Sequence, residues 1–102
     1  MQKFFIATLL LGLAFSQGAA LAQDAEKARA GEQVFETNCA PCHGERMSNP
    51  NGIFDLTTLR PQDRARFDKA LANGKGQMPS WAGVLSPEEM DQVWAYIQSV
   101  GG

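Results

Sequence analysis

Two cysteines and a histidine lie within five consecutive residues of this sequence, in the segment CAPCH. Two residues separate Cys39 from Cys42, and His43 follows directly; these are all the cysteines and histidines of the 102-residue chain. Three chemistries use residues of these types at this spacing: a thiol–disulfide redox pair, a zinc site, and the covalent attachment of haem. The sequence around the segment discriminates among them.

Thiol redox chemistry and zinc binding fit the chain poorly. A thioredoxin-like CxxC lies near a βαβ pattern, and no stretch here alternates apolar and polar residues as a strand does. Structural zinc takes four nitrogen or sulfur ligands, and the chain has three such residues. A thiol oxidoreductase stays an alternative, since an oxidising compartment permits a disulfide.

Haem attachment uses all three residues. In the C-x-x-C-H signature of c-type haem, the thiols of Cys39 and Cys42 add across the two haem vinyl groups as thioethers. His43 then lies where a ring nitrogen can bind the iron as proximal ligand. The sequence therefore predicts one covalently bound haem c.

The first 22 residues have the pattern of an export signal. Lys3 precedes an apolar run over residues 4–15, and residues 20–22 match a small-residue cleavage site. A membrane anchor would need about 20 apolar residues, and the polar residues 16–17 interrupt this run. We expect a cleaved leader over 1–22, and therefore a periplasmic protein without stable membrane insertion.

We expect residues 23–102 to form one small domain. The chain has 9 basic and 11 acidic side chains and a formal net charge of −2. This balance argues against nucleic-acid binding, which requires a basic patch or stripe. A core this small usually needs a disulfide, a metal or a cofactor for stability, and haem would meet that need.

An all-α fold is predicted, with residues 44–60 and 73–85 as loops. Each of three helices is bounded by residues that start or stop helices. The expected helices are 25–37 after the N-cap Asp24, 62–72 between Pro61 and Asn73-Gly74, and a last helix between the capping box at Ser86 and Gly101.

Gly31 stands inside the first of these helices, where glycine costs about 1 kcal/mol relative to alanine. Gly31 and Phe35 precede Cys39 by eight and four residues, and in this pattern the chain resembles the class I cytochromes c. The resemblance implies a small cytochrome c fold, with three main helices wrapped around one covalently bound haem. It also implies that the first and last helices cross closely at Gly31, with Tyr96 at the crossing.

The resemblance further implies a methionine on the loop before the last helix as the second axial ligand. Met78, in GKGQMPSW, has this position, and its soft sulfur favours reduced iron. Met47 lies only four residues beyond His43 and would have to reach the opposite haem face. Met90 falls in the last helix and is more simply a core residue.

Two further residues are expected at the cofactor. The resemblance implies that a proline carbonyl after the CxxCH accepts a hydrogen bond from the second ring nitrogen of His43, and Pro50 is the proline available for this role. Trp81 is expected either to bind a haem carboxylate or to cover the Met78 loop. Other candidates for binding the haem carboxylates are Arg60, Arg64 and Asn51.

The resemblance implies one-electron transfer without catalysis, because both axial positions are then taken. We expect electron exchange at a haem edge framed by Ala40, Pro41 and residues 77–79. The expected protein is a monomer that docks transiently with periplasmic redox proteins: a dehydrogenase, an oxidase or another cytochrome. Residues 78–97 resemble cytochromes that accept electrons from quinoprotein alcohol dehydrogenases. A gas- or ligand-binding haem protein with a labile sixth ligand remains the alternative.

Overall fold

A computed structural model describes the backbone of residues 2–101 and the side chains of residues 18–101. All the regular elements in this range are helices, joined by loops, and no β-strand forms in it beyond two isolated bridges, Lys75–Met78 and Ala82–Leu85. The predicted all-α class is confirmed. The elements are α1 (Gln2–Asn38), α2 (Ala40–His43), η1 (Glu45–Met47), η2 (Leu56–Thr58), η3 (Pro61–Asp63), α3 (Arg64–Asn73) and α4 (Pro87–Gly101).

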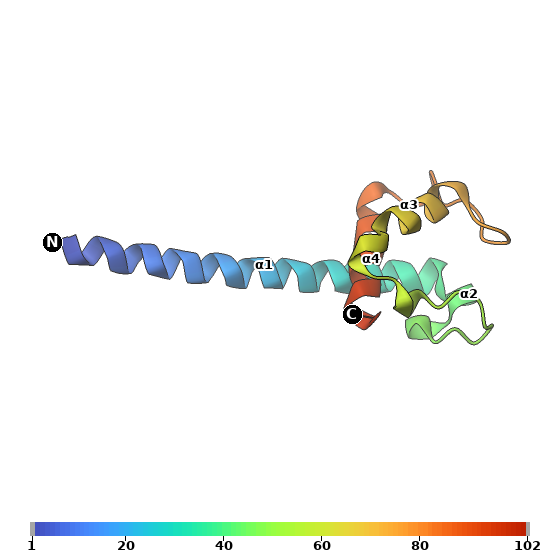
Figure 1. Ribbon diagram of the computed structural model, residues 1–102, viewed down its shortest axis with the longest axis horizontal. Helices are drawn as coiled ribbons and strands as arrows, with labels where there is room; N and C mark the ends of the chain where they lie inside the picture. Colours follow the sequence, from blue (N-terminus) through green and yellow to red (C-terminus); the bar gives the residue numbers. More distant parts are fainter. Residues whose placement is uncertain (1, 102) are drawn as a thin grey trace.

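Helix α1 is longer than the helix predicted for residues 25–37. It runs without interruption from Gln2 to Asn38 and extends well beyond α4 toward the N-terminus (Figure 1). Asp24 therefore lies inside the helix rather than capping it, because the first proline of the chain is Pro41 and nothing earlier removes a backbone donor. Removal of residues 1–22 as a leader stays a prediction. Within the part of the chain whose side chains are described, no helix is long and apolar enough to cross a membrane.

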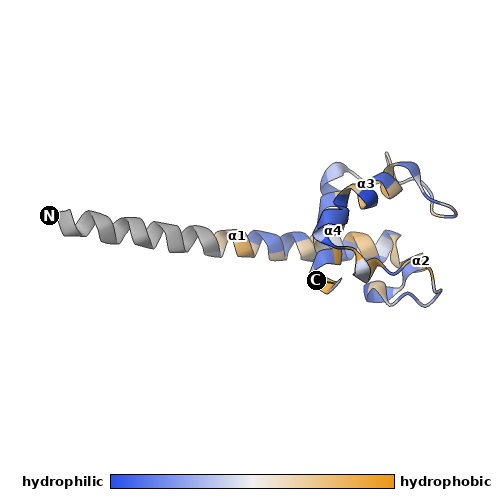
Figure 2. Cartoon of the chain, viewed as in Figure 1, coloured by the Kyte–Doolittle hydropathy of each residue, from blue (hydrophilic) through white to orange (hydrophobic). Residues whose placement is uncertain are grey.

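Helices α1 and α4 cross, and the crossing organises the fold (Figure 1). Gly31 is buried there, and a Cβ at this position would overlap the backbone carbonyl of Gln92 on α4. One turn further along α1, the rings of Phe35 and Tyr96 pack with their centroids 5.4 Å apart. The predicted close crossing is confirmed. Hydrophilic residues are frequent in α1 before it reaches α4, and hydrophobic ones become frequent at the crossing (Figure 2).

Helix α4 begins at the predicted capping box. The Glu89 N–H donates to Ser86 Oγ at 3.1 Å, and the Ser86 N–H donates to Glu89 Oε1 at 2.9 Å. Two backbone donors at the helix start are thereby satisfied. The cap fixes where α4 starts, and so the register in which it meets α1.

Helix α3 starts two residues later than predicted, because Pro61 opens the 3₁₀ turn η3 instead of the α-helix. Its end is as expected: Gly74 follows Asn73 with a φ of 74°, a conformation that glycine adopts without strain. Phe67 of α3 packs on Trp94 of α4 with ring centroids 5.0 Å apart. This contact holds α3 against the α1–α4 pair.

Candidate cofactor site

A cavity of about 1010 Å³ lies between the end of α1, α2, α3, the loop that follows α3, and α4. Its volume is at the upper end of the roughly 300–1,000 Å³ that small-molecule and cofactor sites span. Core side chains such as Phe35, Leu59, Leu71 and Ile97 form much of its wall. A large, flat, mainly apolar group would fit these surroundings.

The CxxCH residues lie together on one wall of this cavity. The last turn of α1 continues almost directly into α2: the Cys39 N–H donates to Phe35 O at 2.7 Å, and the His43 N–H donates to Cys39 O at 2.8 Å. This helical turn brings positions three and four apart to the same side. Cys39, Cys42 and His43 all line the cavity, and no disulfide joins the two cysteines.

Burial controls the protonation of two of these groups. Desolvation, helped by Cys42 and Glu36, raises the pKa of the Cys39 thiol to about 11, so the thiol stays protonated near neutral pH. Burial lowers the pKa of His43, which favours the neutral imidazole that binds metals. The buried Nδ1 of His43 has no hydrogen-bond partner among the described residues.

Met78 lines the same cavity from the loop after α3, and this loop and α2 are separate segments at the end of the molecule away from the N-terminus (Figure 1). The loop is held tightly to the end of α3. The Lys75 and Met78 N–H groups each donate to the other residue's carbonyl at 3.0 Å, and Ser80 Oγ donates to Ala72 O at 2.6 Å. Met78 is half-buried and packs against the core.

The other two methionines with described side chains lie elsewhere. Met47 is only 4% exposed and belongs to the core cluster, while Met90 packs against that cluster from α4. Neither lines the cavity. Met78 is therefore the one methionine among the described side chains that lines the same cavity as Cys39, Cys42 and His43.

Pro50 and Trp81, the two further residues expected at the cofactor, differ in position. Trp81 lines the cavity, and its backbone N–H donates to Leu71 O at 2.7 Å, which joins the end of the Met78 loop to α3. Pro50 is exposed, packs against Gly44, and does not line the cavity. No hydrogen bond joins it to His43 in this structure, so its expected role stays a prediction.

The other three residues expected to bind the haem carboxylates also differ in position. Asn51 lines the cavity, and its Nδ2 donates to Cys42 O at 3.0 Å. Arg60 and Arg64 do not line it. Arg64 pairs with Asp68 at 2.9 Å and with Asp91 at 3.0 Å, and it lies over Trp94. Its guanidinium stabilises the contact between α3 and α4 rather than the cavity.

Several cavity residues were not expected from the sequence. Ile53 and Phe54 are 43% and 45% exposed and line the cavity. The Arg66 guanidinium lies 4.6 Å from the Phe54 ring centroid, and Lys69 and Lys75 also line the cavity. Only the helical spacing of 66 and 69 on α3 hinted that these two side chains share a face.

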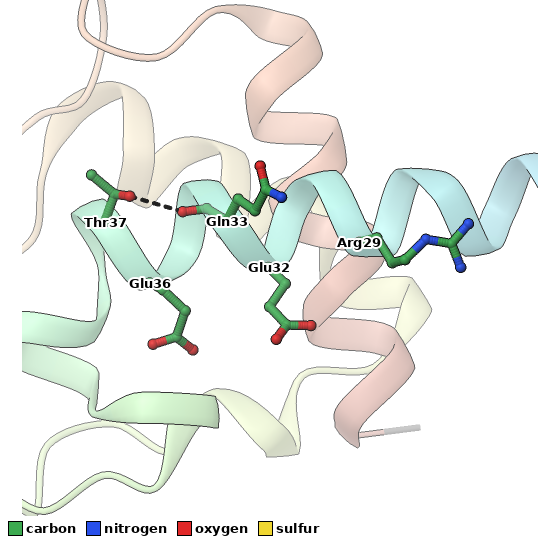
Figure 3. A pocket seen from close by; sticks show the side chains of 5 residues that line it. All are labelled: Arg29, Glu32, Gln33, Glu36 and Thr37. Carbon is green, nitrogen blue, oxygen red and sulfur yellow. Dashed lines mark hydrogen bonds between the residues drawn. The ribbon is translucent and has the colours of Figure 1, made fainter.

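A second, smaller cleft of about 450 Å³ runs along α1 (Figure 3). Its residues are polar: Arg29, Glu32, Gln33, Glu36 and Thr37. The only hydrogen bond drawn among them joins Thr37 Oγ1 to Gln33 O at 3.0 Å. None of these residues is a cysteine, histidine or methionine, so the cleft carries none of the predicted cofactor chemistry.

The helix crossing at Gly31 and the cavity lined by the CxxCH residues form the arrangement expected of a small c-type cytochrome. In agreement, residues 26–97 match the family described as cytochrome C oxidase, cbb3-type, subunit III, and the chain belongs to this cytochrome c family. The predicted cytochrome c fold and family are confirmed. No solved structure matches the chain significantly.

Two kinds of relatives are similar to the chain. It is 38% identical over 77 residues to cytochrome c6 of Bryopsis maxima and 39% identical over 80 residues to cytochrome c6 of Limnospira maxima, covering 84% and 86% of those proteins and 66% and 67% of this chain. It is 35% identical over 81 residues to the cbb3-type cytochrome c oxidase subunit FixP of a Bradyrhizobium species, covering 74% of this chain. That match spans 28% of FixP.

Proposed function

We propose that the protein is a mono-haem electron carrier, with Cys39 and Cys42 as the thioether attachment points and His43 and Met78 as the axial iron ligands. The supporting observation is that these four side chains line one apolar cavity, to which the CxxCH turn and the Met78 loop contribute from separate segments of the chain. Bound haem c supplies one-electron cycling between Fe(III) and Fe(II). The chain's own residues hold that group and exclude water.

Each of the four residues has a distinct part in this proposal. The buried, neutral imidazole of His43 presents a nitrogen lone pair. The loop bearing Met78 is closed by the paired Lys75–Met78 backbone bonds and joined to α3 by the bond from the Trp81 backbone N–H to Leu71 O, which fixes the position of the Met78 backbone. With His43 and Met78 both bound to its iron, haem would offer no open position to a substrate, and the protein would transfer electrons without catalysing a reaction.

The alternatives receive less support. Thiol–disulfide exchange needs a thiolate, and the pKa of about 11 opposes one at Cys39. Ligand binding needs an open or weakly filled axial position, whereas the Met78 loop carries paired backbone bonds. The proposal therefore favours a filled sixth position.

We further propose a periplasmic monomer, released by cleavage after residue 22, that meets its redox partners transiently. The export pattern of residues 1–22 supports this location. Dehydrogenases, oxidases and other cytochromes remain the candidate partners. Among these classes of partner, oxidases are favoured because several relatives are named as subunits of cbb3-type oxidases.

An absorption spectrum of the protein, expressed with haem-maturation machinery and an intact leader, tests the proposal. A sharp reduced c-type α band, together with a weak long-wavelength sulfur-to-iron band in the oxidised form, is the expected result. A c-type spectrum without the sulfur band that changes under carbon monoxide would favour ligand binding instead. If no haem is covalently bound, the result would favour the alternative in which both cysteines act as redox thiols. Mass spectrometry of the same sample reports the cleavage site.

A further inference from the structure

Two asparagine–glycine pairs occur in the chain, Asn51-Gly52 and Asn73-Gly74. In such a pair the glycine nitrogen can attack the side-chain amide of the asparagine, which releases ammonia and leads to a carboxylate. Glycine favours this attack because it has no β-carbon to crowd it and reaches more backbone conformations than any other residue. The two pairs have the same sequence, so any difference in their reactivity comes from the fold.

The pair at Asn73 is held by helical hydrogen bonding. Asn73 is the last residue of α3, and the Gly74 N–H donates to Ala70 O at 2.8 Å. Gly74 is also crowded, since a Cβ at this position would overlap the Met78 carbonyl. An attack by the Gly74 nitrogen would have to break its hydrogen bond and distort the end of α3. The folded structure therefore protects Asn73.

Two other asparagines are blocked in different ways. Asn38 ends α1, and the N–H of the following Cys39 donates to Phe35 O at 2.7 Å. Asn49 precedes Pro50, whose backbone nitrogen carries no hydrogen and cannot serve as the nucleophile. Of the asparagines in the sequence, this leaves Asn51.

Asn51 and Gly52 form the exposed tip of the loop between η1 and η2. Asn49 Nδ2 donates to Ile53 O at 2.6 Å and the Ile53 N–H donates to Asn49 Oδ1 at 3.0 Å, so the loop is closed on either side of the tip. Nothing lies within 4 Å of where a Cβ of Gly52 would stand. The Gly52 N–H donates to Asn49 O at 3.2 Å, the long end of the normal range. Its nitrogen is therefore held less firmly than those of Cys39 and Gly74.

We propose that Asn51 is a deamidation site, at which the folded protein gains a carboxylate in the wall of the cofactor cavity. The Gly52 nitrogen gives its proton to hydroxide and attacks Asn51 Cγ. The N–Cγ bond forms, the Cγ–Nδ2 bond breaks, and Nδ2 takes a proton from water and leaves as ammonia. One water molecule then opens the succinimide ring at either carbonyl, which gives isoaspartate or aspartate. No group is oxidised or reduced.

The reaction changes the cavity wall. Asn51 lines the cavity, and its Nδ2 donates to Cys42 O at 3.0 Å, which joins the loop to the CxxCH turn. A carboxylate is ionised at neutral pH and has no N–H, so this bond is lost. Among the described side chains, no aspartate or glutamate lines the cavity. The product therefore adds a negative charge to a wall that has none from these residues.

The effect on electron transfer rests on the proposed function, whereas the deamidation itself does not. A negative charge close to the haem stabilises Fe(III) relative to Fe(II), because the oxidised iron carries one more positive charge. Deamidated protein should therefore have a lower reduction potential than native protein.

Peptide mapping by mass spectrometry tests the site, after the holo-protein has been kept at mildly alkaline pH. The expected result is conversion of amide to acid at Asn51 and not at Asn73, with isoaspartate detected by isoaspartyl methyltransferase labelling. In guanidinium chloride both pairs should react, because α3 no longer protects Asn73. An unchanged Asn51 in the folded protein, after a time in which the unfolded chain has reacted, would overturn the proposal. Equal conversion of both pairs in the folded protein would show that the fold does not select Asn51.

Asn51→Gln is the matched variant. Glutamine keeps the amide donor, but its longer side chain does not form the five-membered ring readily, so the isoaspartate signal at position 51 should be lost. Asn51→Asp carries the charge of the product and should have a lower potential than both the native protein and Asn51→Gln. Equal potentials would overturn the effect on the haem and leave the deamidation site standing. A protein without a c-type spectrum would fail the proposed function, and peptide mapping would still decide the reactivity of Asn51.

Discussion

Gly31 and Gln92 lie so close that a single methyl group on Gly31 would overlap the Gln92 carbonyl. Gly31→Ala gains about 1 kcal/mol of helix propensity but must push α4 away, and overpacking of this kind costs about 1–3 kcal/mol. The close neighbour is rigid helix backbone, so we expect net destabilisation. Guanidinium unfolding of the holo-protein measures it. Gln33→Ala, an exposed change on the same helix, should stay within about 0.5 kcal/mol.

Replacing Met78 tests its proposed role as axial ligand. Met78→Ala should abolish the sulfur-to-iron band and lower the reduction potential, because thioether ligation favours reduced iron. Met90→Ala is the matched control, since Met90 packs against the core without lining the cavity. It should lower stability and leave the band in place. Retention of the band in Met78→Ala would show that another group binds the iron.

Ser80 should affect how readily another ligand displaces the Met78 sulfur from the iron. Its Oγ donates to Ala72 O at 2.6 Å and accepts from the Ala82 N–H at 3.3 Å, so it links the Met78 loop to α3. Losing such a bond costs about 1 kcal/mol. We expect imidazole to displace the methionine sulfur at a roughly fivefold lower concentration in Ser80→Ala. Ser80→Thr keeps the hydroxyl and should restore the native midpoint; a native midpoint in Ser80→Ala would show that the bond is dispensable.

The Asp91 cluster predicts a pH dependence of stability. Hydrogen bonds from Lys27 and Arg64 lower the pKa of Asp91 below its usual value of 3.8. Because the folded-state pKa lies below the unfolded one, the stabilisation is present above pH 4 or so and disappears as the pH falls through the folded pKa. The side chain is 39% exposed, so solvent limits the contribution to about 1 kcal/mol or less.

Unfolding of the native protein and of Asp91→Asn should be compared across this pH range. The stability difference should be largest near neutral pH and disappear as the pH falls through the folded-state pKa of Asp91, which lies below 3.8. Glu88→Gln, at the start of the same helix, controls for removing a carboxylate outside this cluster. A difference that does not change with pH would assign the effect of Asp91→Asn to packing instead.

Features that depend on neighbouring residues were predictable because their chemistry is local. The capping box of Ser86 and Glu89 and the stop at Gly74 need only the bonds and φ angles of a few adjacent residues. The CxxCH turn likewise brings its three side chains together through helix geometry alone. For these, spacing along the chain is nearly equivalent to position in space.

Features that depend on distant segments required the fold. Sequence could name Met47, Met78 and Met90, but only packing shows Met47 in the core and Met78 at the cavity. In the same way, Arg64 forms an ion pair with Asp91 of α4 and does not line the cavity. Arg66, two residues later, lines it. Such choices are settled by long-range contacts that compete for the same side chain, and no local pattern records which contact prevails.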